Sequence, residues 1–367
     1  MADQQPSRPQ LACDYCRHPA GLLDWQCGGC SGPISITNLP AFDASAIRHN
    51  AWSLWRYQAM LPVPRRFSLG EGGTPLVEVD GPGQTFLAKL EYLNPTGSFK
   101  DRGTVTLVNH LLQQGVNEVV EDSSGNAGAS LAMYTGATGI HARIFAPASA
   151  PEGKKRLIAL NAELVEVPGP RSAPTEACHE AARETVYASH AWSPFFIAGQ
   201  MTVAWEVWEQ LGRRAPGAIV CPTGHGGLFL GFARGFKALL DAGLIERLPA
   251  MIAVQSESCD PIVRAWESGR DEPEPAVQNQ TVADGIVVAL PSRGREILAA
   301  IRGSGGRALR VDDAAILRAR DTLTKRGLLV EPTSAVPVAA LERFDLHVDG
   351  EIVIALTGSG LKSLAGN

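Results

Sequence analysis

Apolar and polar positions alternate along the chain so that short strands and amphipathic helices are expected in turn from about residue 68 onward. Apolar runs of strand length are TFLAKLEYL, EVVED, HARIFAP, AELVEVPG, AIVCP, MIAVQS and EIVIALTG. Segments with helical spacing lie between them: DRGTVTLVNHLLQQG (ending at Gly115), GASLAMYTGATG, TVAWEVWEQLG and GFARGFKALLDAG. This alternation predicts an α/β fold with mainly parallel sheets covered on both faces.

The segment before residue 68 is organised differently. Residues 11–38 hold four cysteines, and residues 44–62 are predicted to form a helix that runs into the proline-rich linker LPVPRR. A length of 367 residues is sufficient for two domains and a small third one.

Composition excludes several classes of protein. Apolar residues make up 45% of the chain and charged residues 19%, which is typical of a globular protein. A net charge of −5 argues against a nucleic-acid partner, and no apolar run reaches the roughly 18 residues of a membrane span. The N-terminus lacks the layout of a signal peptide, and the seven cysteines do not form a disulfide framework, so we expect a cytoplasmic protein in a reducing compartment.

In an α/β sheet, ligands bind beyond the carboxyl ends of the strands, which directs attention to the loops there. The loop from Pro222 to Leu228 is rich in glycine and precedes a helix, so converging main-chain N–H groups favour a phosphate. It matches neither the Walker loop nor the dinucleotide fingerprint, because Phe229 occupies the third glycine position. A tight turn without a ligand is the alternative interpretation.

Two other loops contain residues that could take part in catalysis or ligand binding. Lys100 lies at a predicted helix N-terminus, where the helix dipole disfavours a cation and thus favours a neutral amine or an imine. The segment from Asp122 to Gly128 combines hydroxyls, an amide and main-chain N–H groups that could bind a carboxylate. Taken singly, each segment could equally be a solvated turn or a helix cap.

Together, these motifs resemble a known family. Residues 94–103 resemble the cofactor-lysine motif of the threonine synthase family, within the tryptophan-synthase-β-like fold of pyridoxal-phosphate (PLP) enzymes. SSGNAG resembles the family's substrate loop, residues 224–228 its phosphate loop and TGSGLK its C-terminal cofactor segment. The resemblance covers about residues 65–365. It implies two parallel-sheet α/β domains, with residues 41–118 and 192–367 in the larger, residues 119–191 in the smaller and residues 1–40 in a zinc-ribbon-like segment.

The resemblance also implies roles for individual residues. Lys100 would carry PLP as a Schiff base and then move the α-proton, Phe99 would lie against the cofactor ring, and Asn126 would bond its 3′ oxygen. Thr357 would face the pyridine nitrogen with a neutral hydroxyl, which favours elimination and replacement over transamination. The substrate carboxylate would be bound by Ser123, Ser124 and Ala127, and the cofactor phosphate by Gly224, His225, Gly226, Gly227 and Leu228.

The chain departs from the family pattern at one place. Threonine synthases proper carry an Asn-Ser pair and an arginine for the substrate phosphate before a Gly-Gln-x-Thr helix start. By position, these residues become His190-Ala191 and Phe196 here. Losing a charge-assisted phosphate partner should cost on the order of 1.5–3 kcal/mol. An apolar pocket for an unphosphorylated amino acid is one interpretation, and simple core packing of these aromatic residues is the other.

The four N-terminal cysteines form two Cys-x2-Cys pairs, at Cys13 and Cys16 and at Cys27 and Cys30. Four thiolates at this spacing suit a structural, tetrahedral zinc ion, and they leave no open position for catalysis. A reduced segment without metal is the alternative.

The resemblance thus implies a PLP-dependent lyase or synthase that acts on an amino acid by β/γ elimination or replacement. Conversion of O-phosphohomoserine to threonine is the leading hypothesis. A serine/threonine dehydratase-like lyase, a β-replacement synthase and a catalytically silent ligand-binding relative remain as alternatives. A homodimer that binds neither nucleic acid nor membrane is expected.

Overall fold

A computed structural model of the chain describes residues 8–81, 84–150, 152–170 and 172–364, so the first seven residues of the N-terminal segment lie outside it. The chain divides into two compact units. Unit 1 comprises residues 1–72, 100–199 and 362–367, and unit 2 comprises residues 73–99 and 200–361. Each unit is organised around its own sheet with parallel strands, so the predicted α/β fold is confirmed. The three-part domain division proposed from sequence remains a prediction.

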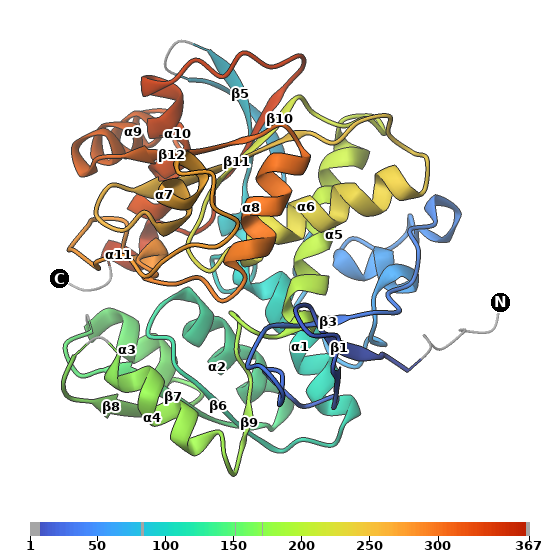
Figure 1. Cartoon of the computed structure of the whole chain (residues 1–367), viewed down its shortest axis with the longest axis vertical. Helices are drawn as coiled ribbons and strands as arrows, with labels where there is room; N and C mark the ends of the chain where they lie inside the picture. The colour runs from blue at the N-terminus through green and yellow to red at the C-terminus, as the bar shows by residue number, and fades with distance from the viewer. Residues whose placement is uncertain (1–7, 82–83, 151, 171, 365–367) are drawn as a thin grey trace. The chain divides into compact units, whose positions relative to one another are not determined.

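Unit 1 contains a four-stranded parallel sheet. Its strands are, in spatial order, β8 (Glu163–Val167), β7 (His141–Pro147), β6 (Glu118–Glu121) and β9 (Val186–Tyr187). Three helices pack against these strands (Figure 1): α2 (Asn126–Thr138), α3 (Glu152–Ala159) and α4 (Ala173–Ala181). Because β6 and β9 are parallel neighbours, the residues that follow Glu121 and Tyr187 leave the sheet at the same edge.

Helix α1 (Lys100–Gln113) also belongs to unit 1, and α5 (Pro194–Gln210) begins there. The two helices approach closely at glycines. A Cβ atom on Gly103 would lie 2.5 Å from the Phe196 ring, and one on Gly199 would lie 2.0 Å from the Arg102 carbonyl oxygen. Side chains at either glycine would therefore push α1 and α5 apart.

The N-terminal segment forms a small antiparallel sheet in the order β2 (Pro19–Ala20), β1 (Leu11–Cys13), β3 (Ile34–Ile36). The helix predicted over residues 44–62 is wrong, because the segment forms two short 3-10 helices, η1 (Ala44–Ala46) and η2 (Leu54–Met60). Asp43 and Ser53 each accept a hydrogen bond from a main-chain N–H two residues later and so start separate turns. Between them, Ile47 is extended, which breaks the helical run.

Unit 2 is built on a six-stranded sheet in which β4 alone pairs in antiparallel fashion. The order is β12 (Arg307–Val311), β11 (Ala250–Ser256), β10 (Ala218–Pro222), β13 (Ile352–Ala355), β5 (Thr85–Lys89) and β4 (Leu76–Asp80). The predicted strand TFLAKLEYL ends at Lys89 and turns into the 3-10 helix η3 (Glu91–Leu93). The central strands are buried on both faces, as their apolar runs predicted.

Helical segments connect the parallel strands of unit 2, with one helix between β10 and β11, three helical elements between β11 and β12, and two helices between β12 and β13 (Figure 1). They are α6 (Gly227–Asp241), α7 (Pro261–Glu267), η4 (Asp284–Ile286), α8 (Gly294–Gly303), α9 (Asp313–Lys325) and α10 (Pro332–Arg343), with α11 (Leu361–Leu364) crossing into unit 1. The small residues of α10, which include Ala335, Ala339 and Ala340, are fully buried in the main apolar core together with the sheet. Within the described residues, no helix combines the length and apolar character that crossing a membrane requires.

Candidate functional site

Three of the loops singled out in the sequence leave the sheet of unit 2 at one edge. Strands β10, β13 and β5 are successive parallel neighbours, so the segments after Pro222, Ala355 and Lys89 emerge together at their carboxyl ends. These segments contain the glycine loop, Thr357 and Phe99. The fold thus provides a physical reason for motifs that lie more than 250 residues apart in sequence to belong to one site.

The glycine loop packs closely against neighbouring segments of unit 2 and precedes a helix. Gly226 has a φ of +82° and precedes the first residue of α6, and a Cβ atom there would lie 2.4 Å from the Ile297 side chain. A Cβ atom on Gly224 would lie 3.1 Å from the Ile286 Cα atom. The first N–H groups of α6, starting at Gly227, have no acceptor inside the helix. Their positive end and the lack of side-chain bulk fit a phosphate group.

Thr357 is part of a buried hydroxyl network. Its Oγ1 lies 2.9 Å from Ser334 Oγ, and Ser334 Oγ accepts a 2.8 Å hydrogen bond from the Gly358 N–H. Both hydroxyl side chains are buried and uncharged. An aromatic nitrogen opposite Thr357 would therefore meet a neutral hydroxyl group.

Phe99 is anchored through its main chain. Its N–H donates to the Thr357 carbonyl oxygen at 3.0 Å, and its own carbonyl accepts from Gln200 Nε2 at 3.1 Å. Lys100 is the next residue in the chain and begins α1, so the lysine starts from a fixed main-chain position.

In unit 1, Lys100 is surrounded by an aromatic ring and an acidic group. Its Nζ atom lies 5.8 Å from the centre of the Phe196 ring. Glu121, which ends β6, is fully buried and interacts electrostatically with Lys100. His190, in the loop after β9, places Nδ1 2.6 Å from Glu121 Oε1, and its ring centre lies 6.1 Å from that of Phe196. The environment of the lysine thus combines one apolar wall with one acid–imidazole pair.

The predicted substrate loop forms the N-terminus of α2. The Ser123 Oγ accepts a hydrogen bond from the Gly125 N–H, and α2 starts at Asn126 with Ala127 buried behind it. A Cβ atom on Gly128 would lie only 1.9 Å from the Ser123 carbonyl oxygen, so the loop folds directly over the helix start. The Asn126 amide oxygen accepts a 2.7 Å hydrogen bond from Lys362, a residue of the predicted C-terminal motif.

The predicted residues divide between the two units. Lys100, Phe196 and the carboxylate loop with Ser123, Ser124, Asn126 and Ala127 fall in unit 1, whereas Phe99, Thr357 and residues 224–228 fall in unit 2. Within each unit the structure brings its share together: Phe99 with Thr357, and Lys100 with Phe196. Sequence reasoning missed the Glu121–His190 contact. No sequence signal pointed to it, because Glu121 is the last residue of β6 and His190 follows β9, a strand that the apolar pattern did not predict.

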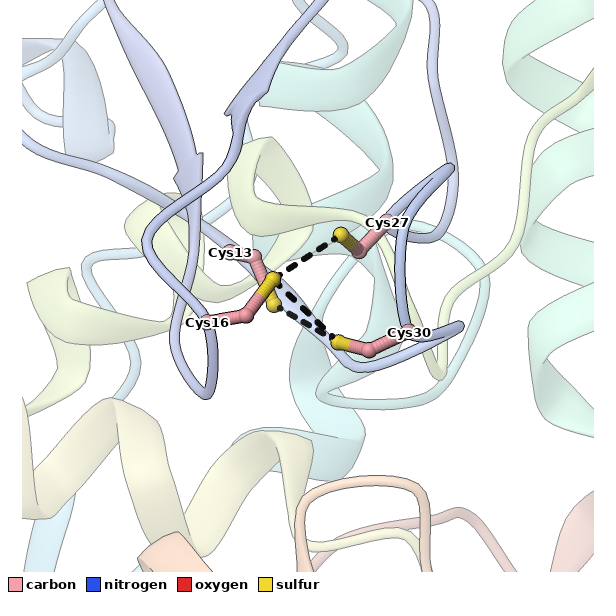
Figure 2. Close-up of side chains that lie close together, drawn as sticks. All are labelled: Cys13, Cys16, Cys27 and Cys30. Carbon is pink, nitrogen blue, oxygen red and sulfur yellow. Dashed lines mark hydrogen bonds between the residues drawn. The ribbon is translucent and has the colours of Figure 1, made fainter.

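The four cysteine sulfur atoms of the N-terminal segment gather at one point (Figure 2). Sγ distances are 3.4 Å for Cys13–Cys30 and Cys16–Cys30 and 3.5 Å for Cys16–Cys27, and all four sulfur atoms lie within 4.8 Å of one another. Four sulfur atoms at about 2.3 Å from a tetrahedral zinc ion would be about 3.8 Å apart, so the cluster has the size of a zinc site. No disulfide joins the described cysteines.

The thiols of the cluster are not equivalent. Burial raises the pKa of the Cys13 thiol. Hydrogen bonds from the main-chain N–H groups of Cys16 and Tyr15 outweigh this effect and lower the pKa to about 7. A hydrogen bond from the Gly32 N–H lowers the pKa of the Cys30 thiol. The adjacent Cys13 and Cys16 sulfur atoms outweigh this effect and raise the pKa to about 12. Main-chain donors thus stabilise a thiolate at Cys13, the form in which cysteine binds metal.

Comparison with known proteins agrees with this geometry. Residues 67–358 match the family described as pyridoxal-phosphate dependent enzyme. A threonine synthase from Methanosarcina acetivorans is 33% identical over 91% of this chain and 86% of that protein, and one from Methanocaldococcus jannaschii is 34% identical over 86% of this chain and 82% of that protein. The crystal structure of a threonine deaminase from T.th. superposes with a TM-score of 0.65 at 30% identity, covering 78% of this chain and 92% of that one.

Proposed function

Since the chain belongs to the pyridoxal-phosphate dependent enzymes and is threonine synthase-like within them, we propose that it catalyses elimination or replacement at the β or γ carbon of an amino acid, with Lys100 as the cofactor lysine. The observation that carries this proposal is Lys100 at the start of α1, directly after the anchored Phe99. When bound, the cofactor supplies an electron sink for the substrate's α-carbon. The chain's own residues supply binding, orientation and proton transfer.

The cofactor phosphate is proposed to lie at Gly224, His225, Gly226, Gly227 and Leu228. Support comes from the N–H groups at the start of α6 and from the absence of side-chain bulk at the glycines. Thr357, held by Ser334, would be the neutral partner of the pyridine nitrogen, and Phe99 would lie against the ring. Beside a neutral partner the pyridine nitrogen need not be protonated, so the cofactor ring would withdraw electrons less strongly than beside an aspartate, which suits elimination and replacement.

On the other unit, Asn126 and the Ser123–Ala127 loop are proposed to bind the cofactor's 3′ oxygen and the substrate carboxylate. Because the Asn126 Oδ1 accepts from Lys362, Nδ2 is the atom through which the amide would donate to the cofactor's 3′ oxygen. The hydroxyls of Ser123 and Ser124 and the N–H of Ala127, near the start of α2, would orient the carboxylate. Lys100, once the substrate amine has displaced it, would take the α-proton.

Threonine synthesis from O-phosphohomoserine is the first candidate reaction, because the curated relatives compared above are threonine synthases. The second candidate is a dehydratase-like or β-replacement reaction on an unphosphorylated amino acid. It is favoured by Phe196, which is buried beside Lys100 and offers no charge to a substrate phosphate. A catalytically silent relative is the third, and the Lys100 position argues against it.

One pair of assays separates these candidates. The cofactor-loaded protein would be incubated with O-phospho-L-homoserine, and phosphate and threonine would be measured. Parallel samples with L-serine and L-threonine would be assayed for keto acid. Phosphate with threonine supports the first reaction, keto acid supports the second, and no product from any substrate, with a normal cofactor spectrum, would refute the proposed catalytic function.

Cys13, Cys16, Cys27 and Cys30 are proposed to hold a structural zinc ion. The proposal is supported by the sulfur spacing and by the lowered pKa of Cys13. Elemental analysis of protein purified without chelators should find about one zinc per chain, and a Cys16→Ser, Cys30→Ser variant should lose it. Full metal content in that variant would contradict the assignment.

Assembly and location are also proposals. We infer a homodimer, as the family resemblance implies, which light scattering over a range of concentrations would test. A cytoplasmic location agrees with seven cysteines of which the described ones form no disulfide.

A further inference from the structure

Glu121 is a buried carboxyl group that the proposed reaction leaves without a role. It ends β6 with an exposed fraction of 1%, and its Oε1 contacts His190 Nδ1 at 2.6 Å. No hydrogen-bond partner for its Oε2 atom is found among the described residues. A buried carboxyl oxygen without a partner is costly, so a purely structural role accounts poorly for an acidic residue here.

The topology of unit 1 explains why the two groups meet. Strands β6 and β9 are parallel neighbours, and the Ala188 N–H donates to the Val120 carbonyl oxygen, so the pairing continues one step past β9. Glu121 and His190 therefore leave the same edge of the sheet. His190 is only 16% exposed, and the centre of the Phe196 ring lies 6.1 Å from the His190 ring and 5.8 Å from the Lys100 amine.

We propose that Glu121 and His190 act as one proton-sharing pair that controls the protonation of the Lys100 nitrogen. The proposal rests on the proposed role of Lys100 as the cofactor lysine. The pair is neutral when one proton lies between Glu121 Oε1 and His190 Nδ1, which are 2.6 Å apart, and a second proton is on His190 Nε2. Loss of one proton leaves the pair with a single negative charge, which stabilises a cation on Lys100. Glu121 and His190 are positioning residues in this account.

Several titratable groups surround Glu121 and affect its charge. Burial raises the pKa of the Glu121 carboxyl well above its ordinary value, and Asp122 raises it further, whereas Lys100 and His190 lower it. The remaining titratable neighbours are on α4 and β9: Cys178 and Tyr187. Burial raises the pKa of both, so they stay neutral near pH 7. Among the described groups that act on Glu121, Asp122 has the largest electrostatic effect on the carboxyl, followed by Lys100 and His190, and only Lys100 and His190 favour its negative charge.

The test is a pH titration of the cofactor's absorption in the holoenzyme, which reports the protonation of the nitrogen that joins it to Lys100. Glu121→Gln keeps the size of the side chain but cannot become negative, so the titration midpoint should fall by about 1 pH unit or more. His190→Leu should lower it as well, because an unpartnered buried Glu121 stays protonated. Free cofactor would be removed before the titration and folding of each variant checked by circular dichroism, so that released cofactor does not mimic the shift.

A matched control is available on the surface. His141 and Glu163 form a second histidine–glutamate contact, at 3.4 Å, but their side chains are 57% and 51% exposed. His141→Leu should leave the midpoint unchanged. Wild-type midpoints in both Glu121→Gln and His190→Leu would overturn the proposal. A wild-type protein that shows no cofactor absorption, or retains it fully in Lys100→Ala, would instead refute the proposed function on which the inference rests.

Discussion

The substitution Gly128→Ala tests whether the Ser123–Ala127 loop positions the substrate. An added Cβ atom would lie 1.9 Å from the Ser123 carbonyl oxygen, whereas a carbon and an oxygen atom in contact are about 3.3 Å apart. The loop or the helix start must therefore move by about 1.4 Å, the difference between the two distances. Because the obstacle is main chain, no rotamer change relieves it.

A displacement of about 1 Å at a substrate-positioning element can lower turnover on the order of 100-fold. The effect on stability should be smaller. Overpacking lowers the free energy of unfolding by about 1–3 kcal/mol, whereas replacing glycine by alanine in a helix raises it by up to about 1 kcal/mol. We therefore expect a kcat/KM reduced by about two orders of magnitude in a protein that unfolds only a few degrees below wild type.

Steady-state kinetics with O-phospho-L-homoserine, and titration of the cofactor spectrum with L-threonine, would measure the effect. Gly303→Ala, at the end of α8, is the matched control, because its Cβ atom would meet nothing within 4 Å. Wild-type kinetics and amino-acid affinity in a folded Gly128→Ala protein would refute the reasoning that this loop binds the substrate.

Three further predictions concern other parts of the chain. Gly226→Val should release the cofactor during dialysis, since the residue needs a φ of +82° and its Cβ atom would lie 2.4 Å from Ile297; normal retention would argue against the phosphate loop. Removing metal from the cysteine cluster by chelation should lower the melting temperature measured by calorimetry, and an unchanged value would speak against a structural metal. Burial lowers the pKa of His110 to about 4, so as pH falls from about 6.5 to 4 the unfolded chain takes up a proton that the folded chain does not. The free energy of unfolding, measured with urea, should therefore fall by up to about 3 kcal/mol over that range. In His110→Gln it should depend less on pH.

Much of the fold could be predicted because its signals are local. The seven predicted apolar runs are found as β5, β6, β7, β8, β10, β11 and β13, whereas β9 and β12 were not predicted. The helix predicted to end at Gly115 is found as α1, with Gly115 at a φ of +71° just beyond it. Local signals misled the prediction at residues 44–62, where the apolar spacing suits a helix but the hydrogen bonds accepted by Asp43 and Ser53 start two separate turns. Capping residues there outweigh periodicity.

The site was predictable only in part, because some of its contacts depend on strand order. The glycine loop and the lysine segment each carry a recognisable composition. The contact of Thr357 with Ser334, 23 residues earlier, has no such signal, nor has that of Glu121 with His190, 69 residues apart. Both arise from elements that become neighbours only when the sheets form, so no spacing along the chain encodes them.

The central claim is that Lys100 carries the cofactor, and peptide mapping after chemical reduction tests it most directly. The cofactor-loaded protein would be treated with borohydride, digested and analysed by mass spectrometry. The account predicts that the cofactor's added mass appears on the peptide containing Lys100 and disappears in Lys100→Ala. Added mass on another lysine, such as Lys362 or Lys89, or on none, would contradict it.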